Sequence, residues 1–162
     1  MNSKAESFKR YVEEQQPGVF QIEELEGDEQ QTVIFRSTVS IQRQQLPIMV
    51  VIDSSVFSII RVQVVPKAFA DENKVELFNF INEQNLSYKP FKFFFNDLGD
   101  LMMECCLLFT GEEAKSEEVY LLFNVLINYL NENYRKIMKL IWSGPDEKDA
   151  DSEANEEKGS EE

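Results

Sequence analysis

The residues best suited to nucleophilic chemistry are two adjacent cysteines, Cys105 and Cys106. Neighbouring side chains on a strand point to opposite faces, so this pair should not form a disulfide. A reactive thiolate needs a basic neighbour, and the chain has no histidine. The lack of histidine also excludes Ser-His-Asp and Cys-His catalysis and the common zinc sites. We therefore expect one thiol in the core and the other facing solvent or a second layer.

A second pattern, Asp97-x-x-Asp100, offers carboxylates at a spacing that faintly resembles a calcium loop. It lacks the alternating acids and the distal glutamate of such a loop. Asn96, Asp97 and Gly99 tolerate the positive φ angles of tight turns, so the pattern favours a hairpin turn.

Aromatic and basic residues alternate near one segment, which could form a platform for single-stranded nucleic acid. The residues are Lys89, Phe91, Lys92, Phe93, Phe94 and Phe95. Nucleic-acid affinity depends on excess Lys and Arg, whereas this chain carries a net charge of −14. We interpret the segment as a core strand whose rings pack under the last helix.

Three further functions find little support in the residue pattern. The chain has six glycines, but none fits a phosphate-binding or dinucleotide-binding loop. It has 30 acidic residues, so paired carboxylates for glycoside hydrolysis are not excluded by counting, but nothing marks one pair as buried. We predict no cofactor, no metal and no enzymatic activity.

Composition indicates one soluble domain followed by a tail. The tail, residues 143–162, has nine acidic residues and two lysines, a net charge of −7, so the other −7 lies on residues 1–142. The tail contains no apolar residue except alanine, and we expect it to be disordered. It would bind a basic partner surface or simply maintain solubility. Free thiols, a polar N-terminal segment and no apolar run of about 20 residues predict a cytoplasmic protein without membrane contact.

The hydrophobic periodicity predicts an α+β fold within 1–142. Ser3-x-x-Glu6 is typical of a capping box, and Asp71 is expected to cap the second helix. Four strands with short connections should form an antiparallel meander. The expected elements are a helix at 4–15, strands at 19–22, 33–41, 46–52 and 56–65, a helix from 71 to 85, strands at 91–95 and 101–109, and a helix opened by Ser116 and stopped by Gly144-Pro145.

The last helix is unusually apolar. Ten of the twelve residues from Val119 to Leu130 are apolar, and Asn124 and Asn128 align with Asn131 and Arg135 in one polar stripe. A helix this apolar should be buried on most sides, by the sheet on one side. A second copy of the chain would cover the other, so we expect a homodimer.

Residues 5–145 resemble the YbjN-like family, which is loosely described as bacterial sensory transduction regulators. The resemblance rests on the order and spacing of four segments. They are Leu46-Pro47-Ile48, the helix from Glu76 to Asn85, the strand Phe91-Lys92-Phe93 with the turn Asp97-Leu98-Gly99-Asp100-Leu101, and Ser116-Glu117-Glu118 before an apolar helix. The family often has a proline after the tyrosine of its last helix, whereas Arg135 follows Tyr134 here.

The resemblance implies a fold like the type III secretion chaperones: helices on one face of a curved antiparallel sheet, in the order α-ββββ-α-ββ-α, often as dimers. It brings no catalytic residue. Together with the residue pattern it predicts a non-enzymatic module, chaperone-like or regulatory, that binds a protein partner. The alternatives are a transient adaptor in bacterial signalling or stress response, and an enzyme that uses carboxylates alone. No catalytic, cofactor, metal or partner-binding residue can be assigned from the sequence.

Overall fold

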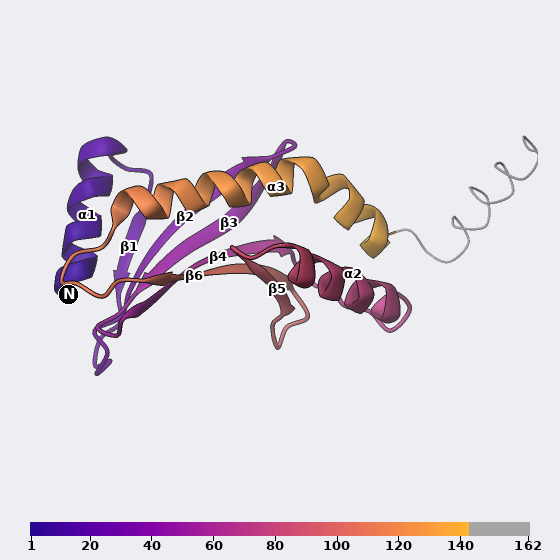
Figure 1. Cartoon of the computed structure of the whole chain (residues 1–162), viewed down its shortest axis with the longest axis horizontal. Coiled ribbons are helices and arrows are strands. Elements are labelled where there is room, and N and C mark those ends of the chain that lie inside the picture. The colour runs from indigo at the N-terminus through magenta and orange to yellow at the C-terminus, as the bar shows by residue number, and fades with distance from the viewer. Residues whose placement is uncertain (143–162) are drawn as a thin grey trace, which may run out of the picture.

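The computed structural model describes residues 1–142, so the predicted disordered tail and the Gly144-Pro145 helix stop lie outside the described residues. Within 1–142 the predicted α+β order α-ββββ-α-ββ-α is observed (Figure 1). The elements are α1 Ser3–Gln15, β1 Gln21–Glu24, β2 Val33–Ile41, β3 Gln44–Ile52, β4 Phe57–Val65, α2 Lys74–Ser87, β5 Lys92–Phe95, β6 Leu101–Leu108 and α3 Ser116–Trp142.

The six strands form one antiparallel sheet in the order β1-β2-β3-β4-β6-β5. The first four strands make the predicted meander, and the β5–β6 hairpin adds to it through β6. Pro47 lies in the part of β3 that pairs with β2 alone, because pairing with β4 begins at Ile48. A residue without an N–H therefore costs no ladder hydrogen bond there.

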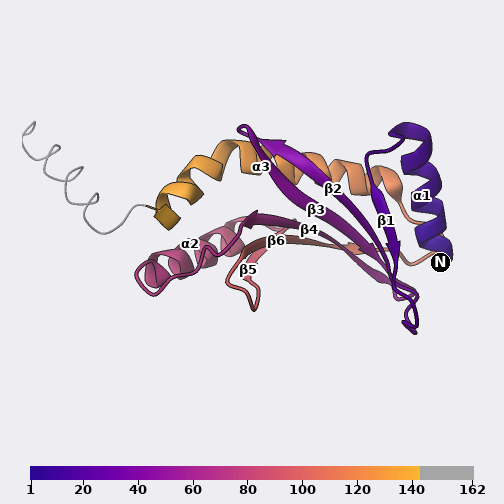
Figure 2. The ribbon, with the colours of Figure 1, turned by 180° about the vertical axis from the view of Figure 1, so that it is seen from behind.

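The helices cover one face of the sheet, which we call the inner face. In Figures 1 and 2, α3 runs along this face, α1 lies at the β1 end, and α2 lies beside β5. Alternate side chains of each central strand point inward and are buried, as period-2 patterning requires. On β2, β3, β4 and β6 these are Val33, Phe35, Ile41, Leu46, Ile48, Val50, Ile52, Ile60, Val62, Val64, Met103, Cys105 and Leu107.

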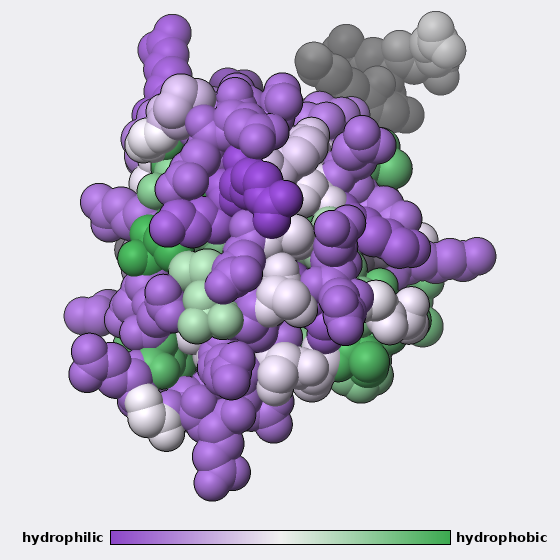
Figure 3. Space-filling view, turned by 90° about the vertical axis from the view of Figure 1, so that its left-hand side faces the viewer, coloured by the Kyte–Doolittle hydropathy of each residue, from purple (hydrophilic) through white to green (hydrophobic). Residues whose placement is uncertain are grey.

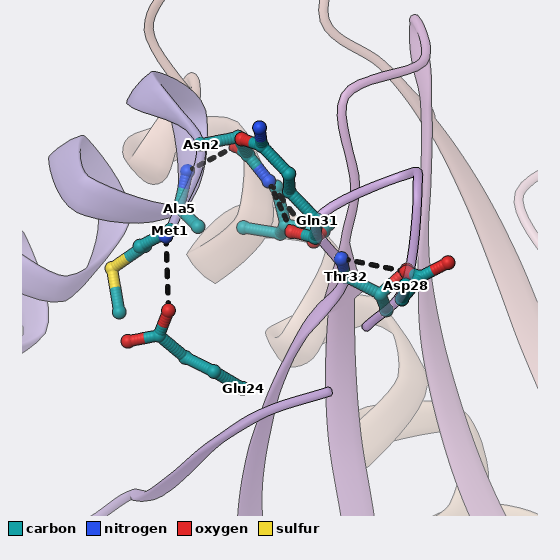
Figure 4. A network of polar contacts seen from close by, with 8 residues as sticks. Met1, Asn2, Ala5, Glu24, Asp28, Gln31 and Thr32 are labelled. Atoms are coloured by element: carbon teal, nitrogen blue, oxygen red, sulfur yellow. Dashed lines mark hydrogen bonds and ion pairs between the residues drawn. The ribbon is translucent and has the colours of Figure 1, made fainter. Parts of the chain in front are cut away.

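Helix α1 is capped by Asn2 rather than by the predicted Ser3. The Asn2 Oδ1 atom accepts a hydrogen bond from the Ala5 N–H at 2.9 Å (Figure 4). The Asn2 Nδ2 group also donates to the Gln31 carbonyl at 2.9 Å, which ties the helix to the β1–β2 loop. Asn2 thus caps the helix with its side-chain oxygen and holds the β1–β2 loop with its nitrogen, a tertiary contact that the local capping-box pattern does not contain.

The prediction that Asp71 caps α2 is also wrong. Asn73 occupies the N-cap position, and residues 71–73 form a turn before the helix. The Asn73 side chain accepts from the Ala70 N–H and donates to the carbonyl oxygens of Ala68 and Ile141. Asn73 therefore fixes the start of α2 to the end of α3, a tertiary contact that the local sequence does not reveal.

The first strand lies two residues later than predicted, at Gln21–Glu24. It pairs with residues 33–36 only, and three of its four side chains are exposed. A strand with so little burial leaves no clear alternation in the sequence.

Helix α3 uses most of its apolar residues inside the chain. Val119, Phe123, Leu126, Leu130 and Ile137 are among its buried residues. Its outward side is mostly polar, and Leu121 is the most exposed apolar residue there at 63% before the helix end. The apolar character of α3 is therefore explained by packing within the chain, which removes one reason for expecting a dimer through this helix. No helix within residues 1–142 is long and apolar enough to cross a membrane.

Candidate functional site: the uncovered sheet face and the sheet edges

The two cysteines point to opposite faces of β6, as predicted. Cys105 is buried in the core and Cys106 is exposed on the outer face, the face without helices. Burial raises the pKa of the Cys105 thiol to about 11, and the neighbouring Cys106 and Glu104 act in the same direction. A thiol with so high a pKa is not a nucleophile at neutral pH.

The Asp97–Asp100 segment is the predicted hairpin turn between β5 and β6. Gly99 has a φ of +78°, and its N–H donates to the Asn96 carbonyl at 3.0 Å. Asp100 is 5% exposed, and its carboxylate accepts from the Lys67 N–H, the Gln63 Nε2 and the Asn96 Nδ2. These donors lower the pKa of Asp100, the Lys67 N–H most strongly. Its carboxylate therefore serves to fix the turn.

The aromatic run divides between three environments. Phe91 and Phe93 pack against Tyr129 of α3, with ring centroids 4.7 and 5.8 Å away, as the core interpretation predicts. Phe94 lies on the outer face beneath the Arg61 guanidinium, and Phe95 packs beside α2 instead. The prediction that all four rings lie under the last helix is therefore wrong for Phe94 and Phe95.

Lys92 of this run does not form a basic platform with the rings. Lys92 Nζ donates to the carbonyl oxygens of Asn85 and Tyr88 at 2.6 and 2.7 Å. Its ammonium group thus binds the last carbonyls of α2, where the helix dipole is negative.

The outer face carries a row of apolar side chains across four strands. The register pairs Ile34 with Val51, Val51 with Ile59, and Ile59 with Cys106. Phe57 and Leu108 form the next pair along the sheet and are 58% and 54% exposed. We call these six residues the outer apolar row. The outer side of an antiparallel sheet is commonly polar, so an apolar row there is informative.

A charged row lies directly beside the outer apolar row. The register places Arg36, Met49, Arg61, Glu104 and Lys92 in line across the sheet. The Arg61 Nε atom donates to Glu104 Oε2 at 2.7 Å, and the Arg36 Nε atom donates to Oε2 of Glu23 at 3.0 Å. The two arginines of this row are thus ion-paired, and the row is a band of paired charges next to an apolar surface.

The two edges of the sheet are treated differently. At β5, the Asn85 side chain accepts from the Phe93 N–H at 2.8 Å and donates to the Phe93 carbonyl at 3.1 Å. An asparagine thus takes the place of a further strand and closes this edge. At the other edge, β1 pairs with β2 only as far as Arg36, so within residues 1–142 no strand pairs with the free edge of Ser37 to Ile41. The segment before β1 contacts this edge through the hydrogen bond from the Ser37 hydroxyl to the Val19 carbonyl at 2.9 Å.

The surface at the α1 end of the molecule is largely hydrophilic, with only small separate apolar patches (Figure 3). A hollow lies there between α1 and the segment before α3, lined by side chains of both charges such as Arg10, Glu14 and Lys115. The hydroxyl of Ser7, which borders it, donates to the Lys4 carbonyl and accepts from the Ala114 N–H. We find no unpartnered buried polar group aimed into this hollow among the residues described.

Comparison with known proteins gives no assignment: no protein-family model matches the chain, and no curated protein matches it in sequence. Within residues 1–142, no group of three or more His, Cys, Asp or Glu side chains is placed to hold a metal ion.

The sequence of β6 itself contains a signal for the outer apolar row. Strand β6 reads Leu-Met-Met-Glu-Cys-Cys-Leu-Leu, which is apolar at positions facing both sides of the sheet. A strand with one solvated face should alternate. Cys106 and Leu108 are apolar where alternation would place polar residues, which indicates an apolar patch on the outer face of β6. The strand pairings are needed to show that this patch continues onto β2, β3 and β4.

Proposed function

We propose that this chain is a non-enzymatic protein-binding module whose partner contacts the uncovered outer face of the sheet. The single observation that carries the proposal is the outer apolar row on the face without helices, in which Phe57, Cys106 and Leu108 are exposed and Ile34, Val51 and Ile59 are partly exposed. Contiguous exposed apolar surface with a polar border is typical of protein interaction sites. Its strands belong to the rigid centre of the sheet, so the surface is formed before a partner arrives.

The chemistry of the ionisable side chains supports a binding role. The buried thiol has a raised pKa, the buried carboxylate of Asp100 is held by three donors, and both are thereby engaged in structure. Catalytic groups instead combine a perturbed pKa with access to a substrate.

The YbjN-like assignment remains part of this proposal. The element order that the resemblance implies is the one observed, and helices on one face of a curved sheet leave the other face free. Fold alone does not fix function, so the identity of the partner decides between a chaperone-like role and a transient adaptor. A chaperone retains an extended client stably, whereas an adaptor releases a folded partner quickly.

The test is affinity capture from extracts of the cells that make the protein. The tagged wild-type chain is compared with Phe57→Glu/Leu108→Glu, which places two charges in the outer apolar row. The matched control is Leu86→Glu/Leu98→Glu, because these leucines are 79% and 76% exposed and belong to α2 and the β5–β6 turn. We expect the wild type and the control to retain the same partner and the outer-face variant to lose it.

Retention of that partner by the outer-face variant would contradict the proposal, as would a wild-type chain that retains no protein. Analytical ultracentrifugation of the purified proteins tests whether the expected homodimer forms. If the wild type is a dimer that the outer-face variant dissociates, the partner on this face is a second copy of the chain.

A further inference from the structure

The second half of β2, residues 37–41, is an open strand edge. The pairing of β2 with β3 is continuous from Val33 to Ile41. Gln42 and Arg43, with φ angles of 46° and 74°, form the turn that connects the two strands. Positive φ at both positions is typical of a tight two-residue hairpin, which makes Ile41 and Gln44 a hydrogen-bonded pair.

The register shows which backbone groups face outward. Because Ile41 bonds with β3, the odd-numbered residues of β2 direct N–H and C=O toward β3, and the even-numbered residues direct them away. The β1 side agrees, since the Leu25 N–H donates to the carbonyl of Thr32, another even-numbered residue. Thr38 and Ser40 therefore present N–H and C=O groups at the edge of β2, beyond the residues that pair with β1.

The Val19 carbonyl accepts from the Ser37 hydroxyl at 2.9 Å at the start of this edge, but no main-chain bond joins the Val19 segment to Thr38 among the described residues. Beyond this contact, the edge lacks the features that normally prevent pairing. Proteins protect exposed edges with charges, prolines, bulges or covering segments. The edge reads Ser-Thr-Val-Ser-Ile, without charge or proline, and its register has no shift. The opposite edge, at β5, is closed by Asn85.

A hollow of about 200 Å³ adjoins the edge on its inner side, between β2 and α3. Its apolar wall includes Val39, Ile48, Phe123 and Ile127, with Asn124 at the rim. None of the described residues that line it is charged, although 28% of the chain is charged. The volume is below the roughly 300–1,000 Å³ of small-molecule sites, which suits an inserted side chain better than a free ligand.

We propose that the open edge of β2 binds an extended, uncharged peptide segment of a partner protein as a seventh strand. Thr38 and Ser40 bond to its main chain, and one of its alternate apolar side chains enters the hollow beneath α3. In such β-augmentation the main-chain bonds provide affinity and the pocket provides specificity. The proposal rests on the proposed protein-binding function but concerns a different surface from the outer apolar row.

A second copy of the chain fits this edge less well. If β2 paired antiparallel with β2 of a second copy, with the two Val39 residues opposite each other, the Gln42–Arg43 turn of the second copy would begin opposite Arg36. That position is already paired with Gln21 of β1. A free segment without a turn at either end avoids this conflict.

The experiment selects peptides from a random library displayed on phage against the full chain. Enriched peptides are then synthesised and titrated against variants. Ser40→Pro removes the outward N–H while keeping the bonds to β3, since proline is tolerated at a free edge position. Its control is Gln45→Pro, on the other strand of the hairpin, where β4 does not pair. Asn124→Glu places a charge at the hollow, and Asn128→Glu, also exposed and one turn further along α3, is its control.

We expect enriched peptides with alternating uncharged apolar residues that bind the wild type and both controls. Ser40→Pro and Asn124→Glu should each weaken binding tenfold or more, and N-methylation of the peptide amide that faces β2 should do the same. No enrichment, or binding unaffected by Ser40→Pro, overturns the proposal. Peptides whose binding is lost only in Phe57→Glu/Leu108→Glu would also overturn the proposal, and would support the outer face as the binding surface. If the chain self-associates and Ser40→Pro reduces this self-association, the segment that pairs with the edge belongs to a second copy of the chain, which overturns the peptide proposal.

Discussion

At the scale of single residues, adjacent side chains in this protein have opposite environments because the strand period is two. Cys105 and Cys106 differ by one position, yet one lies in the core and the other on the outer face. The same rule separates Phe93, under α3, from Phe94, under Arg61. Chemistry at each position therefore follows the face of the sheet, not the residue type.

The cysteines provide a direct check of this assignment. In the native protein at neutral pH, we expect a maleimide to modify Cys106 and to leave Cys105 unmodified, because burial raises the pKa of the Cys105 thiol to about 11. Mass spectrometry should find one adduct per native chain and two after denaturation. Modification of Cys105 at a similar rate would show that β6 does not lie in the described register.

Asp100 provides a second check, through stability and pH. Asp100→Asn replaces an oxygen that accepts from buried donors, so we expect a loss of about 2 kcal/mol in the free energy of unfolding at pH 7. Since the folded-state pKa of Asp100 is lowered, its stabilisation is present above about pH 4 and disappears as the pH falls through the folded-state value. Urea unfolding of the wild type and variant measures this difference.

The matched control is Asp97→Asn, because Asp97 is exposed in the same turn. Its effect on unfolding should be small. If Asp97→Asn and Asp100→Asn cost the same, or if the cost of Asp100→Asn does not decline as the pH is lowered from about 4, the turn is not fixed by the Asp100 carboxylate.

At the scale of elements, polar side chains decide where strands and helices end and what they touch. Asn2, Asn73 and Asn85 each use both the oxygen and the nitrogen of the amide, and each links segments that are separated in the sequence. An amide suits these places because it accepts and donates simultaneously.

The amide of Asn85 is expected to hold β5 against α2. Asn85→Ala leaves the Phe93 N–H and carbonyl without their partner, and we expect a loss of about 2 kcal/mol in the free energy of unfolding. Hydrogen exchange at the Phe93 amide should accelerate more than exchange in β3. Asn82→Ala, an exposed position on the same helix, should leave both quantities nearly unchanged. Unchanged exchange at Phe93 in Asn85→Ala would contradict the edge-closing role.

The periodicity of the sequence predicted the type and order of the helices and strands better than the residues at which they begin and end. Strand β2 was predicted at 33–41 and observed there, because its apolar residues alternate and the inward-facing Val33, Phe35 and Ile41 are buried in the core. The caps were misplaced by one or two residues, since Ser3 and Asp71 have the right local chemistry but Asn2 and Asn73 make the tertiary contacts. The outer apolar row depends on cross-strand register, which no single segment contains.

At the scale of the whole molecule, the fold places its three helices on one face and leaves on the other an apolar row beside a row of paired charges. Arg36, Arg61 and Lys92 lie beside the outer apolar row although the chain has a net charge of −14. These cations already have partners within the chain, so a partner protein of complementary character would present mainly apolar residues to this face.

The most direct measurement of the central claim is photocrosslinking in living cells, with Phe57 replaced by p-benzoylphenylalanine and Leu86 replaced likewise as the control. Both positions are exposed, Phe57 at 58% and Leu86 at 79%, but Phe57 lies on the outer face and Leu86 on α2. The proposed function predicts a discrete crosslinked protein species from position 57 that is absent from position 86. Equal crosslinking from both positions, or none from position 57, would show that the uncovered face of the sheet is not the surface through which this protein binds its partner.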